Sequence, residues 1–522
     1  MNAQMLRGRH VPLLLLFVWL GFTAWVRPLG LPDEGRYVGV AWGMLTSGDW
    51  IVPRLDGLPY FHKPPLFYWM TAGSMALFGP HEWAVRLTPW LGACAGATAL
   101  HLFARRWCGE RVARAALLVL ATQPLVFIGS QFANLDMLVA GCMAVSVFGF
   151  AHAVLADALP GPRRAGLAAG YAFAALAVLA KGLIGIVLPG LVLLAWLLLR
   201  RQWRLLPRLL WLPGMLLFTL LAGPWFVLMQ LRFPEFARYF FIVQQFSRFA
   251  QGGFNNRQPV IFYPVVLAVL ALPWSGWLVA AVRRDSELDA TGRAIRQLLW
   301  TWLIAITVFF SLPQSKLVGY ILPVCWPLAL LVAQRFGAME WRTPARIGRF
   351  WRASAGVALA GCLALVVGVA VFPRKSGRAI GVELRQVVAD GDRVVLLQAY
   401  DFDLSFYARL RHPVVVVEDW QGVEARQDNW RKELADAGHF DPVQSRAVQV
   451  TPAQWPSMLC DGRTTWVIAA PEVAARYAVM ADAKVIAATA DRKLWQLPAN
   501  APAVLKAAGC GRSPAAHPQG MS

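Results

Sequence analysis

Lysine is almost absent from the first 372 residues of the chain, where only Lys63, Lys181 and Lys316 occur. Acidic residues are also scarce there: this part holds 32 Lys+Arg against 13 Asp+Glu, while the last 150 residues hold 18 against 16. Nearly all of the net charge of +21 therefore lies in the first part, as arginine. A basic excess confined to an apolar part indicates membrane topology and argues against a nucleic-acid partner.

Several features typical of other protein classes are missing from the sequence. No internal repeat is evident, which weakens a transporter or flippase assignment, because many transporters consist of repeated halves. The last 150 residues contain no nucleotide-binding loop, catalytic triad or metal-spaced cluster. Only Cys460 and Cys510 are expected on the outer side of the membrane, where one disulfide can form. Because Cys510 lies in a loose tail, this disulfide is not expected to be the main covalent stabilisation of the domain.

Apolar residues are abundant. They make up 57% of the chain, with 24 Trp and 29 Phe, and they come in blocks of about 20 residues, the length of a membrane-spanning helix. The first block lacks a convincing cleavage site, so we expect a retained anchor. The blocks predict a polytopic α-helical membrane protein with eleven spans: 11–29, 84–103, 115–130, 136–155, 167–181, 183–199, 209–230, 260–281, 298–313, 317–334 and 353–372.

The arginines predict the orientation of these spans. If the N-terminus is cytoplasmic, Arg7, Arg9 and five basic loops on the inner side hold 21 of the 32 positive residues of the membrane part. The inverted topology would translocate nearly all of them, against the positive-inside rule. We therefore predict a multi-pass protein of a bacterial inner membrane whose C-terminal part lies in the periplasm.

The C-terminal part is predicted to be a small α/β domain. Strands are expected at 393–399, 412–418 and 464–470, with a helix between the first two, and a helix followed by a closing hairpin after the third. The predicted organisation is a membrane domain over 1–372, a periplasmic α/β domain over 373–499 and a disordered Ala/Pro/Gly-rich tail over 500–522.

All three lysines of the membrane part fall on the predicted outer side. One explanation of these positions is functional, because a lysine ammonium is a compact cation that suits a phosphate. The alternative is that the positions arise by chance in an arginine-rich composition. Two outer loops, 30–83 and 231–259, mix aromatic residues with single charges, and Tyr37–Leu45 and Glu235–Phe246 are predicted to be short interfacial helices. Loops of this kind at the membrane surface could bind a lipid substrate, or they could form a purely structural collar.

The stretch LPDEGRY places Asp33 and Glu34 beside the first span. Acidic residues next to an apolar span are functional candidates. The structural alternative, for these two and for Asp136 at the start of a later span, is a role at a helix N-terminus. Lys181, in a glycine-rich break between spans, either marks topology or binds a lipid phosphate.

Several motifs occur together in order: LPDEGRY, GDWIVPRLDGLPYFHKPPLFYW, FGPHEWAVRL, ANLDML, AKGLIGIVLPG, QQFSRF and SKLVGYILP. Over residues 10–330 the chain resembles the polyprenyl-phosphate-dependent glycosyltransferases of GT-C type. In particular it resembles the 4-amino-4-deoxy-L-arabinose lipid A transferases, which are related to the protein O-mannosyltransferases. The resemblance implies a GT-C fold, an undecaprenyl-phosphate-linked sugar as donor, and lipid A or another envelope glycan or protein as acceptor.

The resemblance also implies roles for individual residues. Asp33 matches the catalytic acidic residue of the first outer loop, and Asp136 matches a second acidic residue. Lys63, Arg248 and Tyr320 match groups that hold the carrier phosphate. Two positions associated with a bound metal depart from the lipid A enzymes, which favour Glu where this chain has His62 and often carry a histidine just before the arginine of QQFSR. The metal question stays open, with Asp33, His62 and Asp136 as candidate ligands and a structural or donor role as the alternative for His62.

The residue types also fit the chemistry without the resemblance. Transfer from a sugar phosphate passes through an oxocarbenium-like transition state, and the phosphate leaving group needs cations and donors. Lys63, Lys316, Arg248 and Tyr320 are groups of this kind, and a divalent metal would do similar work. A hydroxyl acceptor would need Asp33 as base, whereas a phosphate acceptor is already ionised. Three hypotheses remain: an envelope-glycan transferase, a protein O-glycosyltransferase and a lipid-linked sugar transporter.

Overall fold

The structure is a computed structural model, and it describes residues 11–156, 159–247, 256–282, 288–340, 344–372 and 374–510. The chain divides into two compact units. The first, here called the membrane unit, holds residues 1–28 and 61–374, and the second, here called the α/β unit, holds residues 29–60 and 375–522.

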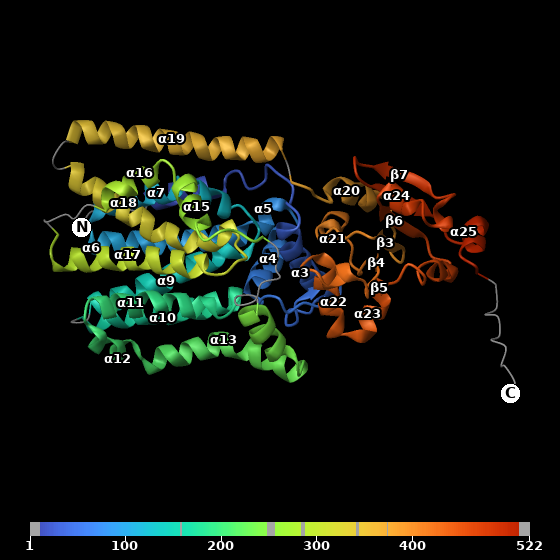
Figure 1. The fold of residues 1–522 in the computed structure, drawn as a ribbon, viewed down its shortest axis with the longest axis horizontal. Helices are drawn as coiled ribbons and strands as arrows, with labels where there is room; N and C mark the ends of the chain where they lie inside the picture. The colour runs from blue at the N-terminus through green and yellow to red at the C-terminus, as the bar shows by residue number, and fades with distance from the viewer. Residues whose placement is uncertain are drawn as a thin grey trace. The chain divides into compact units, whose positions relative to one another are not determined.

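The membrane unit is built from helices joined by turns and loops (Figure 1). Its α-helices are α2 (Val11–Gly21), α4 (Leu66–Phe78), α5 (Glu82–Val85), α6 (Leu87–Trp107), α7 (Glu110–Ala121), α8 (Pro124–Gly129), α9 (Leu135–Leu155), α10 (Pro160–Lys181), α11 (Ile184–Leu199), α12 (Leu206–Leu209), α13 (Leu212–Arg232), α15 (Phe262–Leu270), α16 (Trp274–Ala281), α17 (Ala290–Ser311), α18 (Cys325–Glu340) and α19 (Pro344–Val371). A short 3₁₀-helix, η1 (Trp203–Leu205), a π-helix, η2 (Arg238–Ser247), and a second 3₁₀-helix, η3 (Val318–Val324), complete the unit.

The polytopic helical class is confirmed, whereas the number of spans differs from the prediction. Among the described residues, seven helices are long and apolar enough to cross a membrane, and the α15–α16 pair, bent by 113°, would make eight. Three predicted spans, 11–29, 115–130 and 183–199, are instead represented by α2, the α7–α8 pair and α11, each helix shorter than 18 residues. Hydropathy alone does not detect such breaks, as between α7 and α8, where Pro124 begins a new helix.

Small residues allow the central helices to approach closely. Helix α9 packs against both α6 and α10. A Cβ at Gly141 of α9 would overlap the carbonyl oxygen of Gly92 in α6, so the two backbones are in direct contact. Because lipid provides little hydrophobic force between helices, such close packing is the main source of their association. It fixes α9, whose N-terminal end carries Asp136.

The α/β unit is built on a six-stranded sheet with strand order β5-β4-β3-β6-β8-β7. Strands β5, β4, β3 and β6 run parallel, and β6, β8 and β7 pair antiparallel. The strands are β3 (Arg393–Leu397), β4 (Val415–Val417), β5 (Gln449–Val450), β6 (Thr465–Ala469), β7 (Lys484–Ala488) and β8 (Lys493–Leu497). All five residues of β6 are buried, as expected for a strand covered on both faces.

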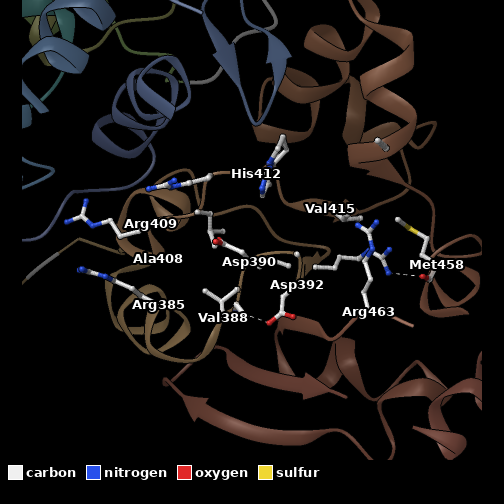
Figure 2. Close-up of a pocket in the computed structure, with 18 residues that line it drawn as sticks. Arg385, Val388, Asp390, Asp392, Ala408, Arg409, His412, Val415, Met458 and Arg463 are labelled. Atoms are coloured by element: carbon white, nitrogen blue, oxygen red, sulfur yellow. Dashed lines mark hydrogen bonds between the residues drawn. The ribbon is translucent and has the colours of Figure 1, made fainter. Parts of the chain in front are cut away.

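Helices and a small hairpin surround this sheet. They are α3 (Asp33–Ser47), α20 (Arg378–Val387), α21 (Leu404–Ala408), α22 (Trp430–His439), α23 (Pro442–Val448), α24 (Pro471–Ala474) and α25 (Pro502–Ala507), with three 3₁₀-helices, η4 (Val423–Arg426), η5 (Pro456–Asp461) and η6 (Ala478–Met480), and the hairpin β1 (Arg54–Leu55) and β2 (Leu58–Pro59). The connections before β3, β4 and β6 line a cavity at the amino ends of these strands (Figure 2).

The predicted C-terminal sheet is confirmed, and the unit gains a segment that the prediction placed elsewhere. Residues 29–60, predicted as an outer loop of the membrane domain, cluster with residues 375–522. The backbone N–H of Leu29 donates to Tyr407 Oη at 2.8 Å, and Trp42 Nε1 donates to the carbonyl of Leu410 at 2.7 Å. The first outer loop therefore folds with the α/β unit.

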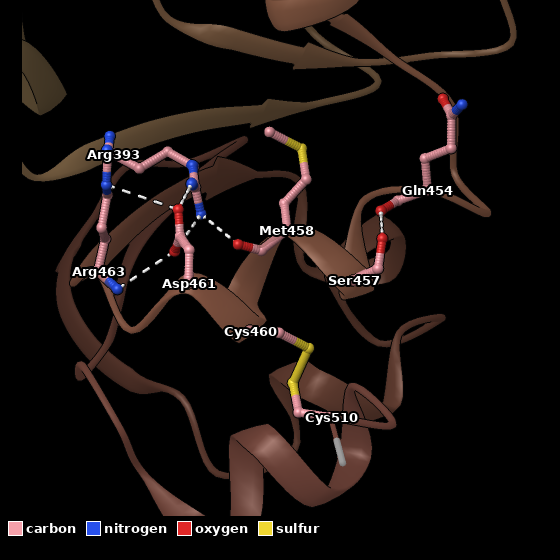
Figure 3. The surroundings of a disulfide bond; sticks show 8 residues. All are labelled: Arg393, Gln454, Ser457, Met458, Cys460, Asp461, Arg463 and Cys510. Carbon is pink, nitrogen blue, oxygen red and sulfur yellow. Dashed lines mark hydrogen bonds and ion pairs between the residues drawn. A yellow bond between two sulfur atoms is a disulfide. The ribbon is translucent and has the colours of Figure 1, made fainter. Parts of the chain in front are cut away.

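The expectation of disorder beyond residue 499 is wrong for the described part of the tail. Residues 502–507 form α25, and Cys510 is bonded to Cys460, which lies at the end of η5 (Figure 3). Val504 belongs to the buried core around Trp455 and Leu459. The disulfide and this core contact fix the segment, while residues 511–522 lie outside the described part of the chain.

Candidate functional site

A buried ion pair joins two of the predicted site residues in the membrane unit. Lys181 Nζ donates to Asp136 Oδ1, and the two side chains are 11% and 8% exposed. The ring of Tyr320 faces the same ammonium, with 4.2 Å from Nζ to the ring centroid. Three predicted residues from α9, α10 and η3 thus meet at one point. We call them the Asp136 cluster: Asp136, Lys181 and Tyr320.

The ends of two helices position this cluster. Asn134 caps α9, since its Oδ1 accepts from the backbone N–H of Asp136 at 3.0 Å and its Nδ2 donates to Asp136 Oδ2 at 3.3 Å. The Asp136 carboxylate lies in the first turn of α9, and Lys181 is the last residue of α10. Each charge therefore sits at the helix end whose dipole stabilises it.

The segment around η3 closes over the carboxylate. Any side chain at Gly319 would overlap Asp136 Oδ2, so the glycine lets this backbone reach the cluster. The Tyr263 hydroxyl donates to the carbonyl of Leu317 at 3.0 Å, and the ring of Tyr320 packs 5.6 Å from that of Phe310. These contacts hold Tyr320 in place beside Lys181.

The side chain of Lys316 is hydrogen-bonded to backbone carbonyls of other residues. Its side chain is 3% exposed, and Nζ donates to the carbonyls of Gln258, at 2.8 Å, and Pro313. Its backbone N–H donates to the carbonyl of Asn256 at 3.0 Å. Lys316 therefore joins two stretches of the chain, and a role in phosphate binding would require it to exchange these partners.

Aromatic packing positions the loop that carries Lys63. The ring of Phe61 lies 4.8 Å from Phe233 and 5.2 Å from Phe236, between ring centroids. His62 is buried, with its ring 6.0 Å from Tyr239, and Lys63 is half-buried before α4. The loop thus packs against the stretch that leads into η2. Arg248, the predicted phosphate ligand that follows η2, lies outside the described residues.

In the α/β unit, the two acidic residues of LPDEGRY differ sharply in the exposure of their side chains. Glu34 is fully buried, and its Oε2 accepts from the backbone N–H of Gly30 at 2.8 Å. That bond ties the first turn of α3 to the loop before it, whereas the N-cap residue of the helix, Pro32, makes no side-chain hydrogen bond. Asp33 is the first residue of α3 and its side chain is 32% exposed, with Arg36 Nη2 3.8 Å from its Oδ1. Of the pair, Asp33 has the accessible carboxylate.

A network from α22 holds α3. Glu433 Oε1 lies 3.1 Å from Arg36 Nη1, and its Oε2 accepts from the Tyr60 hydroxyl at 2.7 Å. The guanidinium also lies 5.3 Å from the centroid of the Phe402 ring. Burial is the largest single influence on the pKa of Arg36 and lowers it, but the charge interactions with Glu433, Tyr60, Tyr37 and Asp33 together outweigh burial, so the net pKa is raised. Arg36 is thus a charged, fixed neighbour of Asp33.

Sequence reasoning missed Asn134, Gly319, Tyr60 and Glu433. Asn134 carried a usable signal, because an asparagine two residues before an acidic residue at the start of an apolar run is typical of a helix cap. Tyr60 and Glu433 carried none, since they are separated by 373 residues in the sequence.

No set of metal ligands is assembled in the described part of the chain. No group of three or more His, Cys, Asp or Glu side chains there is placed to hold a metal ion. Asp136, one of the three metal candidates, is paired with Lys181 instead. The described residues therefore do not fit a metal centre.

Comparison with known sequences gives a consistent set of relatives. Residues 62–227 match the family model of dolichyl-phosphate-mannose-protein mannosyltransferases. The chain is 36% identical over 315 residues to the undecaprenyl phosphate-alpha-4-amino-4-deoxy-L-arabinose arabinosyl transferase of Pseudomonas aeruginosa, covering 58% of this chain and 55% of that protein. The corresponding protein of Aeromonas hydrophila is 33% identical over 331 residues, covering 62% and 58%. The matched region thus spans about half the length of these curated relatives.

Solved structures extend the likeness to nearly the whole chain. The crystal structure of ArnT from Cupriavidus metallidurans bound to undecaprenyl phosphate superposes with a TM-score of 0.79 at 26% identity, covering 95% of this chain and 98% of that one. The archaeal oligosaccharyltransferase AglB from Archaeoglobus fulgidus matches with a TM-score of 0.51 at 14% identity, covering 77% and 64%, which shows a shared fold only.

Proposed function

We propose, from the premise that this chain is related in sequence and fold to the polyprenyl-phosphate-dependent glycosyltransferases of GT-C type, that it is a membrane glycosyltransferase. It would take a sugar from an undecaprenyl-phosphate carrier and transfer it to lipid A or another envelope glycan, on the periplasmic face of the inner membrane. The 4-amino-4-deoxy-L-arabinose transferases among its relatives favour a pentosyl donor over a hexosyl donor.

The observation that carries the proposal is the Asp136 cluster, in a fold whose relative binds undecaprenyl phosphate. Breaking the bond between sugar and phosphate increases the negative charge of the leaving phosphate. Lys181 presents an ammonium fixed by Asp136 and by the ring of Tyr320. An arriving phosphate would share this ammonium with Asp136, while Lys63 and Arg248 would supply further positive charge.

Asp33 supplies the carboxylate on the acceptor side of this scheme. If the acceptor is a hydroxyl, Asp33 would accept its proton as the new bond forms. If the acceptor is a phosphate, which is already ionised, Asp33 would instead orient it or stabilise the oxocarbenium charge. In both cases Arg36, held by Glu433, is a fixed cation 3.8 Å from the Asp33 carboxylate.

Mass spectrometry of envelope lipids tests the proposal. Lipid A from cells that lack the gene should lose the mass of one sugar, which returns with the wild-type gene and not with Asp33→Asn. We expect Asp33→Asn to reduce transfer by at least about a hundredfold, the usual contribution of a positioned acid or base. Asp482→Asn, at an exposed position of the same unit, is the matched control and should restore the sugar. An Asp33→Asn protein with full activity would contradict the assignment.

A protein acceptor is the second candidate function, favoured by the match of residues 62–227 to the protein mannosyltransferase model. Unchanged lipids together with glycoproteins that lose a sugar would support it. Unchanged lipids and glycoproteins, with undecaprenyl-linked sugars accumulating on the inner leaflet, would support the transporter alternative.

A further inference from the structure

A cavity of about 560 Å³ lies within the α/β unit. It is formed by the connections that precede β3, β4 and β6, at the amino ends of these parallel strands. The proposed transfer reaction makes no use of it. Its volume falls in the range of cavities that bind small molecules, and it is several times larger than one phosphate ion requires.

The lining of this cavity is strongly basic. Figure 2 shows Arg385 and Arg409 on one side, Arg463 on the opposite side and His412 between them. Arg393 and Arg411 also line it, so that five arginines face two acidic residues, Asp390 and Asp392.

The basic side chains differ in how far they are already engaged. Arg393 is occupied, since it donates to the Met458 carbonyl at 2.7 Å and pairs with Asp461. Arg463 Nε lies 3.5 Å from the same Asp461 carboxylate. Arg385 and Arg411 are exposed and form no ion pair with any described residue. The cavity thus presents positive charge that the described part of the chain does not neutralise.

Arg409 is held in an unusual conformation. It follows α21 with φ at +58°, in the left-handed region where glycine is common and another residue costs about 1 kcal/mol. Its guanidinium lies 5.0 Å from the centroid of the Phe406 ring and 5.6 Å from that of Trp42. The two ring centroids lie only 6.2 Å from each other, so the guanidinium packs beside both rings, and this packing reduces the side-chain freedom that Arg409 would lose on binding.

The connection that carries Arg411 and His412 is fixed at both ends. Trp42 Nε1 donates to the carbonyl of Leu410 at 2.7 Å, and the backbone N–H of Val414 donates to Asp56 Oδ1 at 2.8 Å. Helix-end electrostatics would account for Arg385 and Arg409, which lie at the C-terminal ends of α20 and α21. It does not account for Arg411 and Arg463, which lie in connections leading into strands.

The geometry points to a binding site for a phosphate-bearing ligand of about sugar-phosphate size in this cavity. Arginine guanidinium groups bind phosphate oxygens in pairs of parallel hydrogen bonds, and several of them around one cavity favour an anion over a neutral sugar. The phosphate could come from a soluble ester or from a lipid headgroup. The site is independent of the proposed transfer activity, because it uses none of the residues assigned to that reaction.

Calorimetry on the purified full-length protein in non-ionic detergent and phosphate-free buffer tests this inference. The probes are glucose 1-phosphate, short-chain phosphatidylglycerol and uncharged glucose. Arg411→Gln and Arg463→Gln should each weaken binding of the phosphate probe by about tenfold, the effect of losing one charge-assisted hydrogen bond. Arg426→Gln removes the same charge from an exposed arginine outside the cavity and should leave binding unchanged.

Each outcome decides the proposal. Binding of glucose 1-phosphate that is weakened by the two cavity variants alone supports the site with a soluble phosphate ester. Binding of short-chain phosphatidylglycerol instead, with the same dependence on the variants, supports the site with a lipid phosphate. Equal binding by all three variants, or no binding of either phosphate probe, overturns it. Unchanged melting temperatures confirm that the variants fold.

Discussion

At the scale of single residues, the three lysines of the membrane part illustrate how one residue type takes different roles. Lys181 is bound to Asp136 and Lys316 to backbone carbonyls. Lys63 lies in a loop anchored by Phe61. All three lysines share a predicted position on the outer side, but their contacts differ. Lys181 is ion-paired, Lys316 has a structural role, and Lys63 lies in a loop.

This separation predicts different effects of replacing each lysine with alanine. Lys63→Ala should weaken undecaprenyl phosphate binding by about tenfold, because a charge-assisted contact is lost. Lys181→Ala should weaken binding less, since its ammonium already has Asp136 as partner. Lys316→Ala should mainly lower the melting temperature, because the hydrogen bonds that Nζ donates to the carbonyls of Gln258 and Pro313 are lost. Titration of the purified variants with the lipid measures their affinities, and thermal melting measures their stabilities. Equal, negligible losses of affinity would contradict the phosphate role of Lys63.

A buried carboxyl in the α/β unit predicts a pH dependence of stability. Burial raises the pKa of Asp403 to about 7, against the lowering effect of its hydrogen bond from Ser376. The folded state therefore keeps a proton that the unfolded chain releases, so this stabilisation is complete below about pH 4 and is lost as pH rises through 7.

Asp403→Asn should remove this dependence, because an amide can still accept from the Gly377 N–H and donate to Ser376 Oγ. Between pH 4 and pH 8 the wild-type α/β unit should lose on the order of 2–4 kcal/mol relative to the variant. Hydrogen exchange of the amides in β3 and α21, corrected for its intrinsic pH dependence, measures the difference. Parallel curves for the two proteins would show that Asp403 does not titrate in this range.

At the scale of elements, α22 fixes α3 through Glu433. Glu433→Gln leaves the buried guanidinium of Arg36 without its carboxylate, which should destabilise α3 by about 3 kcal/mol. Faster hydrogen exchange in residues 33–47 and a lower kcat at nearly unchanged KM are expected, because Asp33 loses its fixed neighbour.

Asp436→Asn on the same helix is the control, since Asp436 pairs with Lys432 on a more accessible face and its loss should cost less than about 0.5 kcal/mol. If the Glu433→Gln and Asp436→Asn proteins show equal hydrogen exchange in α3 and equal kcat, Glu433 does not position Asp33.

The elements also show how far the sequence could predict this fold. Long apolar runs predicted the seven long helices, because apolarity over about 20 residues is a local property. Buried strands such as β6 were predicted for the same reason. The membership of residues 29–60 in the α/β unit could not be predicted, because it depends on pairs such as Trp42 with Leu410, 368 residues apart. The ion pair between Asp136 and Lys181 could not be predicted either, because it depends on how α9 packs against α10.

At the scale of the whole molecule, the remaining question is which side of the membrane each part faces. Positive charge predicts a cytoplasmic connection at Arg201, between α11 and α12, and a periplasmic α/β unit. The disulfide between Cys460 and Cys510 agrees with an oxidising compartment for that unit.

Site-specific labelling tests this topology. Cysteines at Arg426 and Arg201, both exposed, would be introduced separately into a full-length chain whose five free cysteines are replaced by alanine and whose native disulfide is retained. In intact spheroplasts a membrane-impermeant maleimide should label Arg426→Cys, and it should label Arg201→Cys only after permeabilisation, because the positive-inside rule keeps that connection inside. The reverse pattern would place the α/β unit, and with it Asp33, in the cytoplasm. A periplasmic transfer reaction would then be excluded even if the fold and the Asp136 cluster were correct.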